Sequence, residues 1–193
     1  LQDTPLNNEQ MRMVRTAQGS SRHLLRIIND ILDFAKVESG KLQLEAIEID
    51  VRELVGSVGE LMRSSARNQN LKLSIRVADT VPDIVRGDPI RLRQVLINLV
   101  GNAHKHLDRG CHVKLSAHAR GERVIVVVED NGPGVPEALR ETLFYPLVTG
   151  HPGGSGLGLS IVKGLVEAMG GQVSVGDTPG GGATFTVSLP PAA

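Results

Sequence analysis

Two glycine-rich segments place the strongest limits on the fold of this chain. The first, Asp130-Asn131-Gly132-Pro133-Gly134, follows the strand-like run at residues 124–128 and predicts a tight turn at a strand end. The second, residues 153–159 (GGSGLGL), leads directly into an apolar helical pattern that continues to Met169. Unpaired backbone N–H groups at a helix start attract anions, and phosphates are the natural occupants of such a site. The two segments together predict a nucleotide site where strand, loop and helix meet.

A third segment, residues 98–103 (NLVGNA), adds polar side chains of the right chemistry. Asn98 and Asn102 lie four residues apart on one helix face, and Lys105 follows three residues later on the same side. Amide oxygens beside a lysine suit a triphosphate that carries Mg²⁺. Asp130, a carboxylate at a strand end, can accept a hydrogen bond from an exocyclic amine, so it is the predicted adenine contact.

The first 40 residues carry a different pattern. Small or apolar residues recur there at alternating spacings of three and four, which predicts one long helix with an apolar stripe that ends near Gly40. The stripe consists of Val14, Ala17, Ser21, Leu24, Ile28, Ile31 and Ala35. A lone helix cannot bury such a stripe, so we expect partner helices in a hairpin, a dimer or both. The alternative is a helix packed only on its own globular domain.

From residue 41 onward, short strands and helices follow one another. Strands are predicted at residues 42–47, 71–77, 113–119, 124–129, 172–175 and 183–189. Helices are predicted at residues 50–67, where Asp50 and Glu53 form a capping box, and at 89–106, 136–143 and 156–169. We therefore expect an α+β fold with a mixed sheet backed by a layer of helices.

Charge and hydropathy disfavour other classes of protein. Lys plus Arg and Asp plus Glu are equal at 21 each, so no overall field favours nucleic acid, and we expect no nucleic-acid partner. No apolar run approaches the roughly 18 to 20 residues of a membrane span, so this portion is expected to be soluble.

These segments together resemble the ATP-binding domain of sensor histidine kinases, within the superfamily that also contains gyrase, a heat-shock chaperone and mismatch-repair ATPases. Residues 87–103 resemble the family's N box, Asp130-x-Gly132-x-Gly134 its G1 box and residues 154–159 its G2 box. Residues 143–150 (LFYPLVTG) resemble the short lid of nitrogen-regulatory sensor kinases, and residues 29–42 resemble the end of the dimerisation hairpin in hybrid-type kinases.

The resemblance implies a Bergerat-type ATP-binding domain, a two-layer α/β sandwich, at residues 41–193. Residues 1–40 would be the second helix of a dimeric phosphotransfer hairpin, with residues 1–6 as the tail of the first helix and its loop. Residues 145–154 would form a mobile lid, and a plain surface loop is the alternative. The implied ligands are ATP and Mg²⁺, with the metal on Asn102. The implied ATP-binding residues are Asn98, Asn102, Lys105, Asp130, Gly132, Gly134, Thr149, Gly154, Ser155, Gly156, Leu157 and Gly158.

The resemblance also implies phosphoryl transfer to histidine and not hydrolysis. In the ATP-hydrolysing relatives a glutamate general base stands four residues before the metal-binding asparagine, and Asn98 in that place cannot take a proton. The acceptor histidine would lie upstream of this chain, so no catalytic residue is assigned within it, and it should bind ATP without phosphorylating itself. His23 is interpreted as a histidine at the flank of the helical bundle.

The implied partners are a second copy, joined through the N-terminal helices, and the receiver aspartate of a response regulator. The implied setting is the cytoplasmic portion of a bacterial protein anchored in the inner membrane.

His104 and His106 depart from the family pattern. They flank Lys105 where the family shows an apolar residue and an aromatic residue, which would weaken nucleotide packing and make binding sensitive to pH. The alternative function is therefore a kinase-like regulatory module that docks through its helical bundle on another sensor kinase, with a weak or idle nucleotide site. A protein-serine kinase of the same superfamily, such as an anti-sigma factor, is a minor alternative that the long N-terminal helix disfavours.

Overall fold

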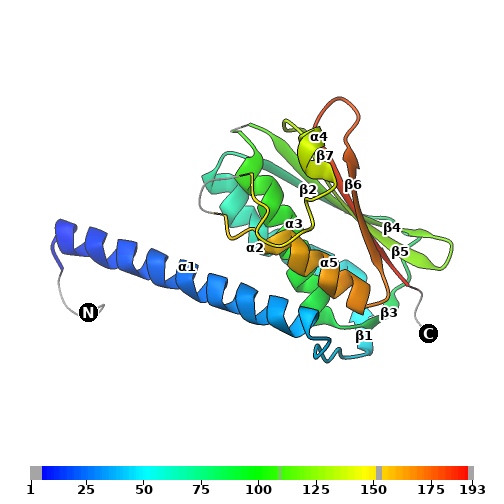
Figure 1. The fold of residues 1–193 in the computed structure, drawn as a ribbon. Helices are drawn as coiled ribbons and strands as arrows, with labels where there is room; N and C mark the ends of the chain where they lie inside the picture. Colours follow the sequence, from blue (N-terminus) through cyan, green and yellow to red (C-terminus); the bar gives the residue numbers. More distant parts are fainter. Residues whose placement is uncertain (1–5, 109, 151–153, 191–193) are drawn as a thin grey trace.

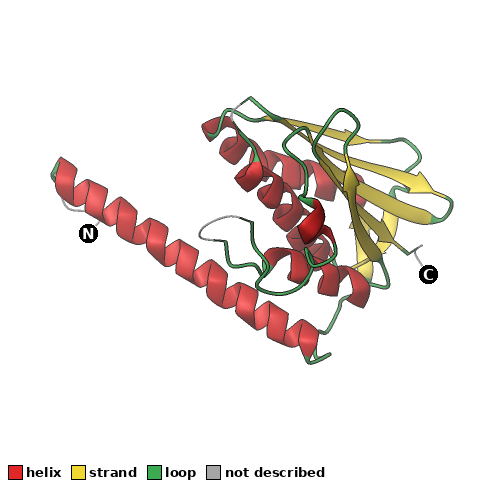
Figure 2. Ribbon diagram, turned by 45° about the horizontal axis from the view of Figure 1, so that its top comes forward, coloured by secondary structure: helices red, strands yellow, loops and turns green. Residues whose placement is uncertain are grey.

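A long helix, α1 (Asn8–Glu38), extends from a body in which helices cover one face of a β-sheet (Figures 1 and 2). The N-terminal half of α1 projects away from this body, whereas its C-terminal end lies against it. This arrangement, seen in a computed structural model of the chain, confirms the predicted α+β fold with a helical N-terminal region and a two-layer α/β sandwich.

The structure describes residues 6–108, 110–150 and 154–190. Some interpretations fall wholly or partly outside this set. They are the tail of a first hairpin helix at residues 1–6, of which only Leu6 is described, the lid at residues 145–154, of which 151–153 are not described, and the surroundings of the His23 side chain.

Both ends of α1 follow from local sequence chemistry. Asn7 caps the helix, because its side chain accepts a hydrogen bond from the Gln10 amide at 2.8 Å. The Gln10 side chain in turn accepts from the Asn7 amide at 3.0 Å, which completes a capping box. The helix ends at Glu38, two residues before Gly40, as predicted.

The main sheet is mixed, as predicted, and it has five strands. Its order is β2 (Lys72–Val77), β4 (His112–Arg120), β5 (Arg123–Asp130), β7 (Ala183–Leu189) and β6 (Gln172–Asp177). The β2 and β4 strands are parallel, and the other neighbours are antiparallel. A separate antiparallel pair joins β1 (Ile47–Asp50) to β3 (Ile84–Gly87).

Three helices cover one face of the sheet, with α3 (Pro89–His106) between α2 (Val51–Asn68) and α5 (Gly158–Ala168). A short fourth helix, α4 (Glu137–Arg140), lies near the β6–β7 end (Figure 1). Asp88 starts α3 by accepting hydrogen bonds from the amides of Ile90 and Arg91, both at 3.0 Å, with Pro89 at the first helical position. The bounds of α3 are therefore those that the sequence predicts.

The core lies between this helical layer and the inner face of the sheet. Alternate residues of the central strands are buried there. They are Val113, Leu115 and Ala117 in β4, Val124, Val126 and Val128 in β5, and Ala183, Phe185, Val187 and Leu189 in β7. The same alternation brings the next residue of β5, Asp130, to the inner face at the strand end.

Several predicted bounds were wrong. The strand predicted at residues 42–47 begins only at Ile47, because Leu42 packs against the core without strand pairing. The β3 strand was not predicted. The helix predicted at residues 136–143 is helical only at Glu137–Arg140 and continues as hydrogen-bonded turns. The last helix begins at Gly158 and not at residue 156.

Candidate functional site

A cavity of about 710 Å³ opens between the end of β5, the C-terminal half of α3 and the segment that leads into α5. This volume is within the usual range for small-molecule sites. The three segments that the sequence singled out converge on it. Of the twelve residues implied to bind ATP, the following line the cavity: Asn98, Asn102, Lys105, Asp130, Gly134, Thr149, Gly154, Ser155, Gly156 and Gly158.

Gly132 and Leu157 do not line the cavity, and each has a structural position instead. The Gly132 amide donates a hydrogen bond to Asp130 Oδ1 at 2.9 Å. The Leu157 side chain is buried in the core, where it belongs to the apolar cluster beneath the helices. Both residues therefore support the walls of the cavity without lining it.

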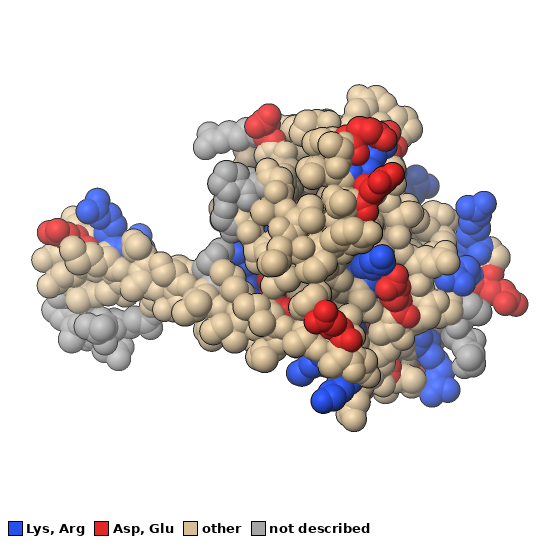
Figure 3. Space-filling model, viewed as in Figure 1, with Lys and Arg blue, Asp and Glu red and all other residues tan. Residues whose placement is uncertain are grey.

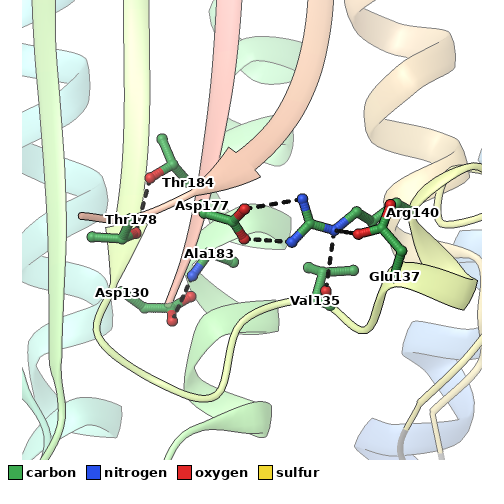
Figure 4. Close-up of polar contacts among 8 residues, drawn as sticks. All are labelled: Asp130, Val135, Glu137, Arg140, Asp177, Thr178, Ala183 and Thr184. Carbon is green, nitrogen blue, oxygen red and sulfur yellow. Dashed lines mark hydrogen bonds and ion pairs between the residues drawn. The ribbon is translucent and has the colours of Figure 1, made fainter. Parts of the chain in front are cut away.

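Asp130 presents one free carboxylate oxygen to the cavity. The residue is only 8% exposed, and Oδ1 accepts hydrogen bonds from the amides of Gly132 and, at 3.1 Å, Ala183 (Figure 4). Among the described residues, both hydrogen bonds to this side chain end on Oδ1. Oδ2 is therefore left to accept a hydrogen bond from a ligand, as an adenine amine would offer.

The face of α3 opposite Asp130 carries the amides and the lysine. Asn98, Asn102 and Lys105 follow at spacings of four and three, and all three line the cavity. The side-chain nitrogen of Asn98, Nδ2, is buried and has no hydrogen-bond partner within residues 6–108, 110–150 and 154–190. A buried donor requires an acceptor, which a phosphate oxygen would supply. Desolvation, together with nearby Arg26, lowers the pKa of Lys105 from its ordinary value, while Asp30 opposes that shift.

The start of α5 supplies backbone donors. In the part of the chain that is described, α5 has no side-chain cap, so the first amides of this 11-residue helix are not satisfied by a capping side chain. The segment that contains Leu147 lies against this turn, because the Leu147 amide donates to the Gly156 carbonyl oxygen at 3.0 Å. The geometry places unpaired N–H groups and a helix dipole at the cavity, as an anionic group requires.

His104 is the unexpected member of this site. It is 4% exposed, lines the cavity, and lies on the side of α3 shared with Ile97 and Gly101. Neither ring nitrogen has a hydrogen-bond partner among the described residues, and burial lowers the pKa of the imidazole. His106 lies near the lid, because its ring comes within 3.8 Å of the position that a Cβ at Gly150 would take.

Sequence analysis did not predict the cavity-lining residues that come from elements distant in the chain. Arg26 and Asp30 of α1 line the cavity, as do Met62 of α2 and the apolar pair Val135 and Leu139. Burial raises the pKa of Asp30, while nearby Arg26 and Lys105 act in the opposite direction. The four-residue spacing of Arg26 and Asp30 places them on one helix face, but no local sequence pattern indicates which part of the protein that face contacts.

Two features are absent from the described residues. No group of three or more His, Cys, Asp or Glu side chains is arranged there to hold a metal ion. None of the helices within that set combines the length and apolar character needed to cross a membrane.

The fold and the cavity define a Bergerat-type ATP-binding domain attached to a long helix. Residues 87–193 match the family model described as histidine kinase-, DNA gyrase B- and HSP90-like ATPase. Residues 1–40 match the His Kinase A (phospho-acceptor) domain. The chain therefore belongs to the histidine kinase-, DNA gyrase B- and HSP90-like ATPase family, and it carries the catalytic ATP-binding domain of sensor histidine kinases.

Relatives and solved structures agree with this assignment. The chain is 39% identical over 202 residues to the sensory/regulatory protein RpfC of Xanthomonas campestris, an alignment that covers 98% of the chain and 28% of RpfC. The crystal structure of full-length ShkA in complex with AMPPNP matches all of the chain and 41% of ShkA, with 38% identity and a TM-score of 0.87. Histidine kinase ThkA in complex with the response regulator protein TrrA matches 98% of the chain and 54% of ThkA, with 26% identity and a TM-score of 0.75.

Proposed function

We propose that this chain is the ATP-binding catalytic region of a two-component sensor histidine kinase. It would hold Mg-ATP in the cavity and donate the γ-phosphoryl group to a histidine outside the chain. The observation that carries this proposal is the convergence of Asp130, the Asn98–Asn102–Lys105 ridge and the α5 start on one cavity. Because the chain spans only 28% of RpfC, the activity of the whole protein is part of the proposal.

Each wall of the cavity has a role in this function. Asp130 Oδ2 would accept a hydrogen bond from the adenine amine, and Val135 and Leu139 would pack on the ring. Lys105 and the amides at the start of α5 would bind the phosphates, with Asn98 and Thr149 beside them. The metal would rest on the amide oxygen of Asn102 and on phosphate oxygens, and it would supply charge neutralisation.

The transfer step needs only positioning from these residues. A histidine ring nitrogen would form a bond to the γ-phosphorus as the bond to the β,γ-bridging oxygen breaks, which leaves ADP and a phosphohistidine. The ring proton of the acceptor would pass to solvent or to a base outside this chain. Asn98 stands where hydrolytic relatives hold a glutamate, so water would not be activated at that position.

The exposed apolar face of α1 supports a dimer. Leu24, Leu25, Ile28, Ile31 and Leu32 are all more than two-fifths exposed in the single chain. Figure 3 shows charged side chains near the N-terminal end of α1 and an uncharged surface along much of the projecting face in view. We propose that a second copy covers this face, and sedimentation at increasing concentration tests it. A monomer at all concentrations would contradict this.

A response regulator is the proposed acceptor of the phosphoryl group after histidine. The ThkA structure contains a response regulator protein, and the present chain shares its fold. Docking of the full chain on another sensor kinase, with an idle nucleotide site, is the competing function.

Calorimetric titration with Mg-ATP and Mg-GTP tests the proposed function. Guanine offers a carbonyl oxygen where adenine offers an amine, so the carboxylate of Asp130 should prefer ATP by about tenfold or more. Asp130→Asn can keep its one oxygen on the amides of Gly132 and Ala183, which turns the NH₂ group toward the base, so that preference should fall. Asn102→Asp serves as a second variant at the metal position, and we expect it to lose Mg-ATP binding. No heat with the unchanged chain would move the assignment to the docking module.

A further inference from the structure

Arg140, the last residue of α4, ties that helix to the sheet beside the cavity. Two of its nitrogens donate to the two carboxylate oxygens of Asp177 at the end of β6, one of them at 3.1 Å (Figure 4). Its Nε donates to the carbonyl oxygen of Val135 at 3.3 Å and lies 3.1 Å from the Glu137 carboxylate. A single guanidinium therefore joins the α4 segment to the edge strand in a bidentate geometry that a point charge cannot reproduce.

Apart from Arg140, the α4 segment is held by apolar packing, because Val135 before the helix and Leu143 and Phe144 after it pack against the core. The helix has four residues, none of them buried, and no side-chain cap among the described residues. A helix this short is not stable by itself. Yet Val135, Pro136 and Leu139 form an apolar wall of the cavity. The position of this wall therefore depends on contacts with the sheet, of which the Arg140–Asp177 pair is the bidentate one.

The anchor at Asp177 belongs to the same unit as Asp130. Asp177 pairs with Ala183 across the β6–β7 hairpin, and the Ala183 amide donates to Asp130 Oδ1 (Figure 4). Gly182 beside it has a φ of 110°, and a Cβ there would come within 1.9 Å of the Asp130 carbonyl oxygen. The end of the β6–β7 hairpin therefore packs directly against the backbone of Asp130.

We propose that Arg140 is a positioning residue for the nucleotide base. Through Asp177 it holds Val135 and Leu139 at a set distance from Asp130, so that the apolar wall packs on the ring while the carboxylate binds its edge. Neither Arg140 nor Asp177 lines the cavity, so their effect on a ligand is indirect. This inference rests on the proposed ATP-binding function.

The test uses two readouts and one matched control. Arg140→Gln and Asp177→Asn each break the pair, Arg140→Lys keeps the charge without the fork, and the double variant Arg140→Asp with Asp177→Arg restores it in reverse. Lys114→Gln is the control, because Lys114 and Glu129 form an ion pair at 2.7 Å between β4 and β5, and neither residue lines the cavity. Hydrogen exchange of amides 135–143 is measured in the free protein, and calorimetry gives Kd for Mg-ATP and for Mg-tripolyphosphate, which lacks a base.

We expect faster exchange across residues 135–143 in Arg140→Gln and Asp177→Asn. Their Kd for Mg-ATP should rise about three- to tenfold, a loss in keeping with a part-exposed bidentate pair, whereas the tripolyphosphate Kd should stay within about twofold. The reversed pair should recover ATP affinity. The Kd of Arg140→Lys should lie between those of the unchanged chain and Arg140→Gln, and the Kd of Lys114→Gln should match that of the unchanged chain.

Three results would overturn the inference. An ATP affinity in Arg140→Gln equal to that of Lys114→Gln removes the positioning role. Equal losses for ATP and tripolyphosphate indicate general destabilisation. If the unchanged chain binds no ATP, the proposed function fails, and the exchange data still decide whether Arg140 holds the wall, because unchanged exchange rates contradict it.

Discussion

Val37 of α1 occupies the space that a side chain at Gly164 of α5 would need. A Cβ atom at Gly164 would lie 2.2 Å from Val37 Cγ1 and 3.3 Å from its Cβ. Phe34, one turn earlier, also packs against the core of the ATP-binding domain. The glycine therefore lets the end of α1 lie directly against α5, and it sets the distance between these two helices.

Gly164→Ala should destabilise the contact between α1 and α5. Valine is stiff at χ1 in a helix, so Val37 cannot rotate away and α1 must move. Overpacking of this kind costs about 1–3 kcal/mol, of which the better helix propensity of alanine returns up to about 1 kcal/mol. Urea unfolding measures the net loss.

Two companion variants separate the causes. Gly56→Ala in α2 adds the same methyl group in open space, so it should be neutral or stabilising. Adding Val37→Ala to Gly164→Ala should recover stability beyond the sum of the single changes, because the clash disappears. Strict additivity would show that the two residues are not coupled.

Asp33 forms the polar part of the same contact. Its Oδ1 accepts a hydrogen bond from the Arg91 guanidinium at 3.1 Å, and its Oδ2 accepts one from the side-chain Nε2 of Gln94 at 2.7 Å. The side chains of Asp33 and Arg91 are less than a fifth exposed. Asp33→Asn should cost about 1.5–3 kcal/mol, because a charge-assisted hydrogen bond is lost and the Arg91 charge stays largely buried. The loss is measured by urea unfolding, and hydrogen exchange should quicken at the C-terminal end of α1.

The exposed carboxylate of Glu38 provides the control for Asp33. Glu38→Gln alters charge on the same helix without touching α3, so its stability and exchange should match the unchanged chain. Equal exchange at residues 30–38 in both variants would mean that apolar contacts alone hold α1.

Lys105 should matter for phosphates and not for the base. Lys105→Gln removes the cation on the α3 ridge, so Mg-ATP should bind about tenfold or more weakly while adenosine is unaffected. Calorimetry with the two ligands gives the comparison. Lys163→Gln, which alters a part-exposed lysine on α5 paired with Glu167, is the control. Equal losses for adenosine and ATP would place Lys105 outside the phosphate site.

Local signals predicted the parts of the fold that depend on neighbouring residues. The Asp88-Pro89 start of α3 and the alternation of β7 gave their bounds correctly. The β3 strand was missed because four residues carry little periodicity, and its pairing with β1 joins positions about 40 residues apart. The Leu42 signal was misassigned because an apolar side chain packed on the core looks like a strand residue.

The candidate site likewise contains residues that the sequence predicted and residues that it could not predict. Asp130 and the glycine segments are motif residues, and their chemistry could be inferred from spacing. Arg26 and Asp30 could not be placed at the cavity, because contacts between a helix and a domain distant in the chain leave no local pattern. The Arg140–Asp177 pair also joins elements 37 residues apart.

His104 should make the stability of the domain fall in acid. Burial lowers the pKa of the folded imidazole below its ordinary value of 6.5, so only the unfolded chain takes up a proton as the pH falls through that value. The imidazole thus leaves stability unchanged at higher pH and reduces it below about pH 6.5, with a slope of at most about 1.4 kcal/mol per pH unit.

His104→Leu removes both the titrating group and two buried nitrogens that have no partner among the described residues. It should raise the free energy of unfolding at pH 7.5 by about 1–3 kcal/mol and flatten its decline between about pH 6.5 and 5. Urea unfolding across that range measures both effects, with His118→Leu on the half-buried β4 position as the control. An unchanged slope would show that the folded and unfolded chains bind protons at His104 equally. Loss of stability at pH 7.5 would show that the imidazole makes a stabilising interaction. The neutral ring would then act through that contact and not as a buried, unpaired group.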